Sequence, residues 1–454
     1  MATVGINFGA ASSGAGFDVA ATVTSILAIQ SAVETPWKAQ LTSLQAQDAA
    51  LSGLGAGLSS LSTAVSALTD FQGVLASKQG SSSNTNLLSL SSASTSAIAG
   101  SHTIEVRSLA QTSSNYSDQI TDASDTLSGS LSIGIGNGRS QTITVDASSD
   151  TLATLASAIN SGTYGVTASV VTDTHGSRLS LVSNASGAAG QIALTSNLQD
   201  ATSATSLAFS SGQTGADAAL TVDGLGTTSA SNTVTGAIPG VTFQLLSAAI
   251  GTNVQVQITN NNGAIEAAMQ TLVTAYNAVA AGIKTQEGKD ASGKAQPLYG
   301  DPTLALLQTQ LSSGLLNGAG SGAVTDLSKL GLTLKQDGTL SLDASKLDGT
   351  LNTHFSDVTS YLQNIGGFGM TLSKAIDTLG STSTTGALSL ALQQNASEET
   401  AINASVSTED ARIAAQKITL TAQLNTANQI LQSIPQQLNE QTQIYNAITG
   451  YKGG

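Results

Sequence analysis

The sequence predicts an α+β multidomain protein with coiled-coil helices at its ends, further helices next to them, and two nested β-rich domains. Two apolar patterns predict the helical ends. Nearly all residues at alternating spacings of four and three are apolar from Ile413 to Ile448, with Lys417 and Gln441 as the exceptions, and the same kind of spacing recurs from Leu51 to Leu68. A third pattern predicts the β-rich centre, because between Ile104 and Ile258 the apolar period becomes an alternation of two.

Composition limits the classes of function. Of the 454 residues only 10% are charged and 3% are aromatic, where about 25% charged residues is ordinary. The net charge of −14 and the pI near 4.4 argue against nucleic acid or anionic membrane as partners, because phosphate binding needs clustered Lys and Arg. The sequence has no cysteine, which excludes disulfides, thiolate nucleophiles and sulfur-ligated metals.

The first 17 residues contain neither a positively charged start nor an apolar run. We therefore expect no cleaved secretory signal peptide and, if the protein leaves the cell, another export route. No run of 18 apolar residues occurs, so we expect no membrane span.

Two helices are expected near the N-terminus. Asp18 can cap a helix that reaches Val33, and Thr35 can cap a second one with Pro36 in its first turn, running to about Lys78. The second helix carries an apolar seam, and Gly80 to Asn86 is expected to be a linker. The seam comprises Leu51, Leu54, Leu58, Leu61, Val65 and Leu68.

The centre reads as a β domain with a second β domain inserted into it. His102 to Arg107 is an expected strand, and Thr112 to Ser130 an expected linker. A hairpin follows, with a three-residue loop Gly136 to Gly138 in which Gly138 is left-handed. Asp150 is expected to cap a short helix. Further strands are expected at Val166 to Val171, Leu179 to Val182 and Ile192 to Leu194.

The segment Ala219 to Ile258 alternates again and is the expected partner of the Ile104 strand. A helix is expected to begin at Ile265. A second helix is expected at Asp301, with Asp301 as its cap and Pro302 in its first turn. Leu332 to Leu342 is an expected hairpin with a three-residue loop, and two or three short helices follow it.

The last helix carries the longer apolar seam. A helix with such a stripe needs a partner, because each Leu or Ile gains roughly 1.5–3 kcal/mol on burial. The alternative is an ordinary amphipathic surface helix. Pro435 predicts a bend or a restart. The apolar seam members are Ile413, Leu420, Leu424, Ala427, Leu431, Ile434, Leu438, Tyr445 and Ile448.

We find no motif that predicts catalysis, a cofactor or a metal. Gly288 to Ala295 is one residue short of a phosphate-binding loop, has Ala295 where a hydroxyl is required, and follows a helical pattern instead of a strand. His102, His175 and His354 each lack a second ligand at a suitable spacing. The convergence of distant carboxylates in space stays open.

Several segments, taken in order, resemble the bacterial flagellar filament cap (hook-associated protein 2) family over nearly the whole chain. The N-terminal lead Gly14 to Val19 and the strand motif Gly100 to Gln111 match the family's opening, and Ile143 to Asn197 is similar to a repeat inserted in flagellins. The gap between Asp18 and Pro36, the low charge of the last helix and Pro435 depart from the family pattern. The second half carries the most specific set: Asp223-Gly224, Ser231-Asn232, Pro239 to Thr242, Tyr276-Asn277, Pro297 to Asp301, Leu330 to Leu332 and Asp337 to Asp343.

The resemblance implies a homo-oligomeric ring of about five subunits at the distal, extracellular tip of the flagellum. Such a cap would help exported flagellin to fold and polymerise and would prevent its leakage. The implied partners are flagellin, the hook–filament junction proteins and a flagellar export chaperone. The expected division is residues 1–40 as an N-terminal segment, 41–80 with 265–395 as a helical leg domain, 81–112 with 207–264 as a β-rich head domain, 113–206 as an inserted outer head domain, and 396–454 as a C-terminal coiled-coil helix.

Three other classes stay open. Flagellin shares terminal helices but fits the order of the second-half motifs less well. An extracellular adhesin would use the Ser- and Thr-rich β region to bind glycans or host surfaces. An enzyme is the third class, and no motif favours it.

Overall fold

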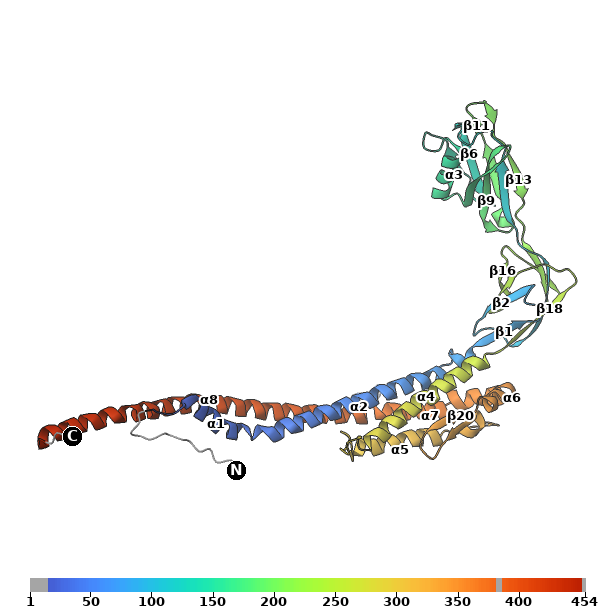
Figure 1. Cartoon of the computed structure of the whole chain (residues 1–454). Helices are drawn as coiled ribbons and strands as arrows, with labels where there is room; N and C mark the ends of the chain where they lie inside the picture. The colour runs from blue at the N-terminus through green and yellow to red at the C-terminus, as the bar shows by residue number, and fades with distance from the viewer. Residues whose placement is uncertain (1–14, 381–385, 451–454) are drawn as a thin grey trace. The chain divides into compact units, whose positions relative to one another are not determined.

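A computed structural model describes residues 15–380 and 386–450 and has the predicted α+β multidomain fold, with helices at both ends and β-sheets between them (Figure 1). The chain forms two compact units. One is the continuous segment Asp70–Ile265, and the other contains the helices before Thr69 and after Glu266. The five-part division into domains stays a prediction.

The helical unit is built from long helices around a small hairpin. Its elements are α1 (Val19–Ser31), α2 (Glu34–Thr69), α4 (Asn262–Gln286), α5 (Pro302–Leu316), the 3₁₀ turn η4 (Leu327–Leu330), β19 (Leu332–Leu334), β20 (Leu340–Leu342), α6 (Ala344–Gln363), α7 (Phe368–Leu379) and α8 (Ala387–Thr449).

Local capping sets where these helices begin. The Asp18 carboxylate accepts from the backbone N–H of Ala21, and the Asp301 carboxylate accepts from Thr303 with Pro302 at the first helical position, both as predicted. The prediction for α2 was wrong at both ends. It begins at Glu34, so that Thr35 lies inside the first turn, and it ends at Thr69, well before Lys78.

The leucine-rich face of α2 lies in the core of the helical unit. It packs against α7 and α8, and Gly57 and Gly282 allow α2 to approach α4 closely. A Cβ atom added at Gly57 would lie 3.2 Å from the Val279 side chain, and one at Gly282 would lie 3.1 Å from Leu54. By length and composition alone the stretch Glu34–Ala76 could cross a membrane. Its leucines are already buried against other helices, which is typical of a core helix.

The predicted hairpin between Leu332 and Leu342 is confirmed. Leu332 pairs with Leu342 and Leu334 with Leu340, and the Lys335 N–H donates to the Thr339 carbonyl at 2.8 Å, which leaves the three-residue loop Gln336 to Gly338. Gly338 at the end of this loop has φ +83°, a conformation that favours glycine.

The longest helix, α8, runs without interruption from Ala387 to Thr449 and contains Pro435. The expected restart at Pro435 was therefore wrong. A proline removes one backbone donor from the helix, and the turns on both sides supply enough hydrogen bonds to continue it.

The unit Asp70–Ile265 contains two hydrophobic cores. In the first, one sheet has the order β1-β18-β3-β14-β15 and a second has the order β16-β17-β2. Their strands are β1 (Lys78–Ser82), β18 (Asn253–Asn260), β3 (Gly100–Ser108), β14 (Ala218–Val222), β15 (Leu225–Ser229), β16 (Thr233–Ile238), β17 (Val241–Leu245) and β2 (Leu88–Ala93), preceded by the 3₁₀ turn η2 (Val74–Ala76).

The strand at Ile104 pairs with strands from the second β segment, as predicted. In β3, Ile104 lies opposite Val222 of β14 on one side and Val254 of β18 on the other. Ile104, Val106 and Val254 are buried in this first core together with Phe243. Every residue between β3 and β14 is therefore an insertion into this β-sheet domain.

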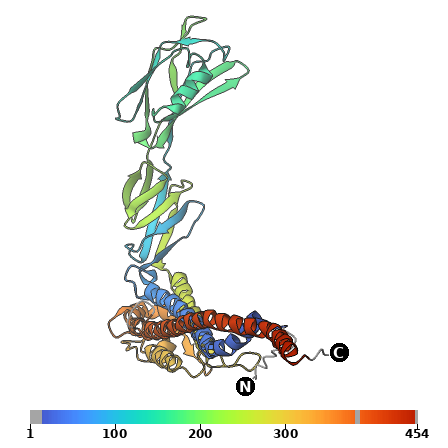
Figure 2. The same cartoon turned by 90° about the vertical axis from the view of Figure 1, so that its left-hand side faces the viewer.

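The inserted segment forms the second core, where α3 (Leu152–Ser161) packs on β8 and β9 (Figure 2). The sheet orders are β13-β4-β9-β8, β10-β6-β7 and β12-β11-β5. The strands are β13 (Phe209–Gln213), β4 (Thr112–Ser117), β9 (Gly176–Ser186), β8 (Val166–Asp173), β10 (Ile192–Ser196), β6 (Ser130–Ile135), β7 (Gln141–Thr144), β12 (Thr205–Ser206), β11 (Gln199–Asp200) and β5 (Leu127–Ser128), with a 3₁₀ turn η3 (Ala188–Gly190).

Two predicted linkers are in part strands. The expected linker at residues 80–86 overlaps β1, which pairs along β18, and the one at residues 112–130 contains β4 and β5. These strands are rich in Ser, Thr and Asn and lack apolar alternation. Backbone hydrogen bonds to an apolar neighbouring strand hold them, and a periodicity criterion does not detect such strands.

Two details of the inserted unit also differ from expectation. Leu131 pairs with Ile143, which is the register expected from a three-residue loop, but the positive φ of +52° is at Gly136 and not at Gly138. The cap of α3 is Thr151, which forms a capping box with Thr154, and not Asp150.

Candidate functional site

The two predicted apolar seams have different surroundings in the folded chain. Every predicted seam residue of α2 is buried, and Leu58 and Leu61 are fully inaccessible to solvent. These side chains belong to the intramolecular core of the helical unit. The group comprises Leu51, Leu54, Leu58, Leu61, Val65 and Leu68.

Helix α8 runs antiparallel to α2 and then to α1. The Asn395 amide of α8 donates to the Asp48 carboxylate of α2 at 2.7 Å, and further along α8 the Asn428 side chain accepts from the backbone N–H of Phe17 at 2.9 Å. Figure 1 shows the three helices side by side. The first six predicted seam residues of α8 are half-buried in this arrangement: Ile413, Leu420, Leu424, Ala427, Leu431 and Ile434.

The last part of α8 leaves its seam exposed. Leu438, Tyr445 and Ile448 have exposed fractions of 48%, 62% and 80%. Together with Ile444 they line a shallow apolar groove along one side of the helix end. Tertiary contacts therefore divide the predicted seam into a half-buried first part and an exposed second part.

The sequence reading missed a second set of exposed apolar residues on α8. Ile418, Ile430 and Ile444 lie off the predicted seam and are 74%, 58% and 59% exposed. Ile430 and Ile444 are 14 positions apart, which is two heptads, so the signal was present in the sequence as a second, sparser apolar row.

A buried carboxylate lies where α1 gives way to α2. Glu34 is 2% exposed, and one of its oxygens accepts a hydrogen bond of 2.6 Å from Lys38. This hydrogen bond raises the pKa of Lys38 above its ordinary value. The second oxygen of Glu34 is buried without a partner within the described residues.

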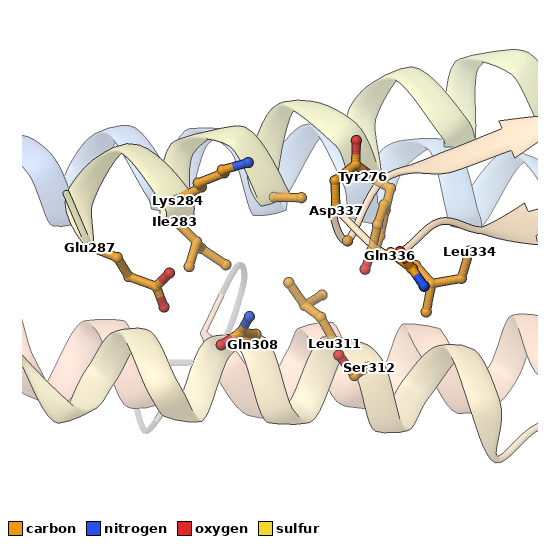
Figure 3. Close-up of a pocket in the computed structure, with 12 residues that line it drawn as sticks. Tyr276, Ile283, Lys284, Glu287, Gln308, Leu311, Ser312, Leu334, Gln336 and Asp337 are labelled. Carbon is orange, nitrogen blue, oxygen red and sulfur yellow. The ribbon is translucent and has the colours of Figure 1, made fainter.

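A pocket of about 300 Å³ lies between α4, α5 and the hairpin β19-β20 (Figure 3). Tyr276 and Ile283 from α4 and Leu311 from α5 form its apolar floor. Charged side chains lie at its rim: Lys284 from α4, Glu287 directly after α4, and Asp337 from the hairpin loop. Composition and motif spacing did not predict this pocket, because its walls come from three separate segments.

One side chain of α4 holds the hairpin wall of this pocket in place. Asn277 holds the hairpin against α4, because its side chain donates to the Leu340 carbonyl at 2.9 Å and accepts from the Leu340 N–H at 2.7 Å. Burial raises the pKa of the Tyr276 hydroxyl.

The near-miss to a phosphate-binding loop is a turn between α4 and α5. The Asp290 carboxylate accepts from the backbone N–H groups of Ser292 and Lys294, both at 2.9 Å, and from the Ser292 hydroxyl. The donors that would hold a phosphate are thus already occupied.

The three histidines lie apart, each beside one aspartate. His102 is 2.7 Å from Asp223, and the closest carboxylates to His175 and His354 are 3.6 and 3.9 Å away. Among residues 15–380 and 386–450, no group of three or more His, Asp or Glu side chains could hold a metal ion.

Comparisons with known proteins match nearly the whole described chain. The family model "Flagellar hook-associated protein 2 N-terminus" matches residues 15–113, and the model "Flagellar hook-associated protein 2 C-terminus" matches residues 215–448. Between them, residues 130–185 match the "Flagellin hook IN motif".

Individual relatives agree with these models. The B-type flagellar hook-associated protein 2 of Pseudomonas aeruginosa is 32% identical over 63% of this chain and 66% of its own length. The flagellar hook-associated protein 2 of Escherichia coli K12 is 30% identical over 76% of this chain and 78% of its own length. The crystal structure of the D1-D2-D3 domains of the flagellar cap protein FliD from E. coli superposes with a TM-score of 0.60 at 27% identity, covering 76% of this chain and 99% of that one.

Proposed function

The chain belongs to the flagellar hook-associated protein 2 family, and we propose that this flagellar cap protein forms a homo-oligomer at the distal tip of the filament. The cap promotes the folding and polymerisation of exported flagellin and prevents its leakage. Its copies, about five by the family resemblance, form a closed ring with cyclic symmetry. Its further partners are the hook–filament junction proteins and an export chaperone, and it is exported by the flagellar apparatus to the cell exterior.

The exposed end of α8 is the observation that supports this proposal most directly. Leu438, Tyr445 and Ile448 expose apolar area on a helix that already has an intramolecular partner along its first part. Burying each side chain against another helix would stabilise an assembly by roughly 1.5–3 kcal/mol. These three residues form the contact with other copies or with filament subunits.

The α2 seam has a different role in this proposal. Its leucines are the core that holds the helical unit together. The half-buried seam residues from Ile413 to Ile434 pack α8 against the N-terminal helices. Only the part of each side chain that is still exposed is available for contact with another subunit.

Family membership favours a cap over the two other non-enzymatic classes. The flagellin-type motif covers only residues 130–185, whereas hook-associated protein 2 models match segments on both sides of it. We propose no catalytic role.

A triple substitution tests the proposal. Leu438→Ser, Tyr445→Ser and Ile448→Ser together should abolish oligomers in sedimentation velocity and abolish swimming, while the circular dichroism spectrum of the monomer stays that of a folded chain. The matched control places three serines on exposed polar positions of the same segment, Gln436→Ser, Asn439→Ser and Asn446→Ser. The control should assemble normally. A triple variant that still forms oligomers and full filaments would contradict the proposal.

A further inference from the structure

Helices α1 and α2 share one coiled-coil row although the helix is broken between them. Buried and half-buried residues follow alternating spacings of four and three across the break. The row includes Asp48, which bonds Asn395 of α8, so it is the row that faces α8. Its polar members Gln30 and Glu34 lie at the break itself. The whole row comprises Val23, Leu27, Gln30, Glu34, Trp37, Leu41, Leu44, Asp48 and Leu51.

Two hydrogen bonds fix which part of α8 lies level with the break. Asp48 bonds Asn395, and Phe17 bonds Asn428, at two points along the antiparallel helices. The break follows Ser31, which is close to midway between Phe17 and Asp48. The corresponding level of α8 is therefore midway between its two asparagines, at about residue 411.

Polar side chains occupy this level on both sides of the contact. Glu34 is 2% exposed, and Glu409 is half-buried with Arg412 bonded to it at 2.9 Å. The pKa of Lys38 is raised mainly by its hydrogen bond to Glu34 and further by the charge of Asp410, which agrees with this register of α8. We call the four polar residues of the two facing rows the junction layer: Gln30, Glu34, Glu409 and Gln416.

The junction layer leaves polar atoms unsatisfied. One side-chain oxygen each of Gln30, Glu34 and Gln416 is buried and has no hydrogen-bond partner in the part of the chain that the structure describes. These three oxygens are acceptors, so they cannot bond one another. Lys38 bonds only the other oxygen of Glu34. Because a buried polar atom without a partner costs free energy, the packing against α8 is weakened at this level.

The backbone is also easily bent at this level. Two residues separate α1 from α2. The hydrogen bonds here span three residues, from the Val33 N–H to the Gln30 carbonyl at 3.2 Å and from the Thr35 N–H to the Ala32 carbonyl at 3.3 Å. Pro36 has no N–H and cannot donate to Ala32, as a continuous α-helix requires. A rotation of α1 relative to α2 therefore breaks few backbone hydrogen bonds.

The two sides of the junction layer differ in how firmly they are packed. Of the 13 residues of α1, Val23 and Leu27 are the buried ones, and α1 packs against α8 (Figure 1). Helix α2 is buried along its length, from Leu44 to Leu68, and packs against α7 as well as α8. If the contact opens at the junction layer, α1 separates and α2 stays in place.

We propose that the junction layer is a release point at which α1 separates from α8 while α2 stays packed. Release uncovers the half-buried seam of α8 from Ile413 to Ile434. This seam is continuous with the exposed residues Leu438, Tyr445 and Ile448. One further step rests on the proposed cap function: the longer apolar surface is the form of α8 that contacts another copy.

Amide hydrogen exchange of the full-length monomer tests the release point. The double variant Glu34→Leu with Gln416→Leu removes two of the unsatisfied oxygens and places apolar side chains in the rows. Protection of Val19–Ser31 should rise by about ten-fold, because the closed state no longer contains these atoms. Protection of Leu51 to Leu68 should stay the same. Gln416→Leu alone, which keeps the pair of Glu34 and Lys38, should give a rise of about three-fold if the double variant does not fold.

A matched pair of substitutions controls for the added leucines. Gln40 of α2 and Gln423 of α8 are exposed. Gln40→Leu with Gln423→Leu should leave the protection of α1 unchanged, because Leu and Gln have similar helix propensities. An equal rise in the control, or unchanged or faster exchange of α1 in the junction variant, would overturn the release point.

Sedimentation velocity tests the further step separately. If release precedes contact with another copy, a ten-fold smaller open population should raise the concentration needed for oligomers by about ten-fold. A junction variant with a protected α1 that assembles at the wild-type concentration would overturn the role of release in assembly. If the wild-type chain forms no oligomers at any concentration, the cap proposal fails, and hydrogen exchange alone decides the release point.

Discussion

The backbone N–H of Phe17 donates a hydrogen bond of 2.9 Å to the Oδ1 atom of Asn428, 411 positions further along the chain. The segment just before α1 is thereby attached to the second half of α8. Helix α1 lies beside α8, and the β-rich unit is in sequence a long insertion between the N-terminal helices α1 and α2 and the later helices.

The Asp48–Asn395 hydrogen bond should make a measurable contribution to the pairing of α2 and α8. Its carboxylate acceptor makes it stronger than a neutral hydrogen bond, and both groups are only partly exposed. Asn395→Ala should lower the free energy of unfolding by about 1 kcal/mol. A double-mutant cycle with Asp48→Ala, measured by urea denaturation, isolates the pairwise energy. The neighbouring exposed Gln394→Ala serves as control, and equal losses for the two alanine variants would refute this reading.

Two glycines in helices should respond to alanine in opposite directions. At Gly314 of α5 an added Cβ would lie 2.9 Å from the Ala375 Cβ of α7, so the two helices must separate. We expect Gly314→Ala to lower the free energy of unfolding by about 1 kcal/mol, because overpacking outweighs the gain in helix propensity. At Gly53 of α2 nothing lies within 4 Å of the added atom, and Gly53→Ala should stabilise by about 0.5–1 kcal/mol. Thermal unfolding of both variants checks the signs, and a stabilised Gly314→Ala would show that α5 and α7 can separate freely.

The hairpin β19-β20 should loosen when Asn277 is shortened. Asn277→Ala leaves both the N–H and the carbonyl of Leu340 without their partner on α4. The expected loss is about 1–3 kcal/mol in the free energy of unfolding, as for buried polar groups left unsatisfied. Faster amide hydrogen exchange in β20 is the local signature of this loss. Asn317→Ala, which removes only an exposed side-chain hydrogen bond to Ser313, should leave exchange in the hairpin unchanged.

Acid should destabilise the folded protein by protonating aspartates in a recurring turn. In this turn the aspartate carboxylate accepts hydrogen bonds from the residues that follow it. The Asp146 carboxylate accepts from the Ser148 hydroxyl at 2.6 Å and from the Ser148 N–H at 2.9 Å, and these bonds hold its pKa below the ordinary value. Hydrogen bonds from a Ser or Thr two residues on lower the pKa values of four more carboxylates in the same way, those of Asp122, Asp290, Asp326 and Asp337.

The sign of this effect follows from linkage. A group whose pKa is lower in the folded state contributes stability that is complete above its unfolded pKa, about 3.9, and is lost as the pH falls through the folded value. The urea midpoint should therefore fall between about pH 4 and pH 2. Asp146→Asn should make this fall less steep. Asn137→Ala, which removes an exposed uncharged side chain from another turn of the same unit, should leave the slope unchanged. The same slope for both variants would exclude this role of the turn.

The sequence by itself determined the elements whose apolar periodicity is strong. The strand at Ile104 with its partners, the hairpin at Leu332, the capped helix at Asp301 and the nested order of the β-rich segments all agree with their predicted places. Local chemistry is sufficient for these, because alternation, caps and loop length act between residues close in the chain. The order of short motifs also identified the family.

Tertiary structure decided which apolar residues are available to a partner. Leu58 and Leu438 belong to equally regular seams, yet the first is fully buried by neighbouring helices and the second is 48% exposed. The polar strands β1 and β4 and the pocket between α4, α5 and the hairpin also depend on segments far apart in the chain. A pattern along one segment records how apolar each face is, whereas burial depends on what packs against that face.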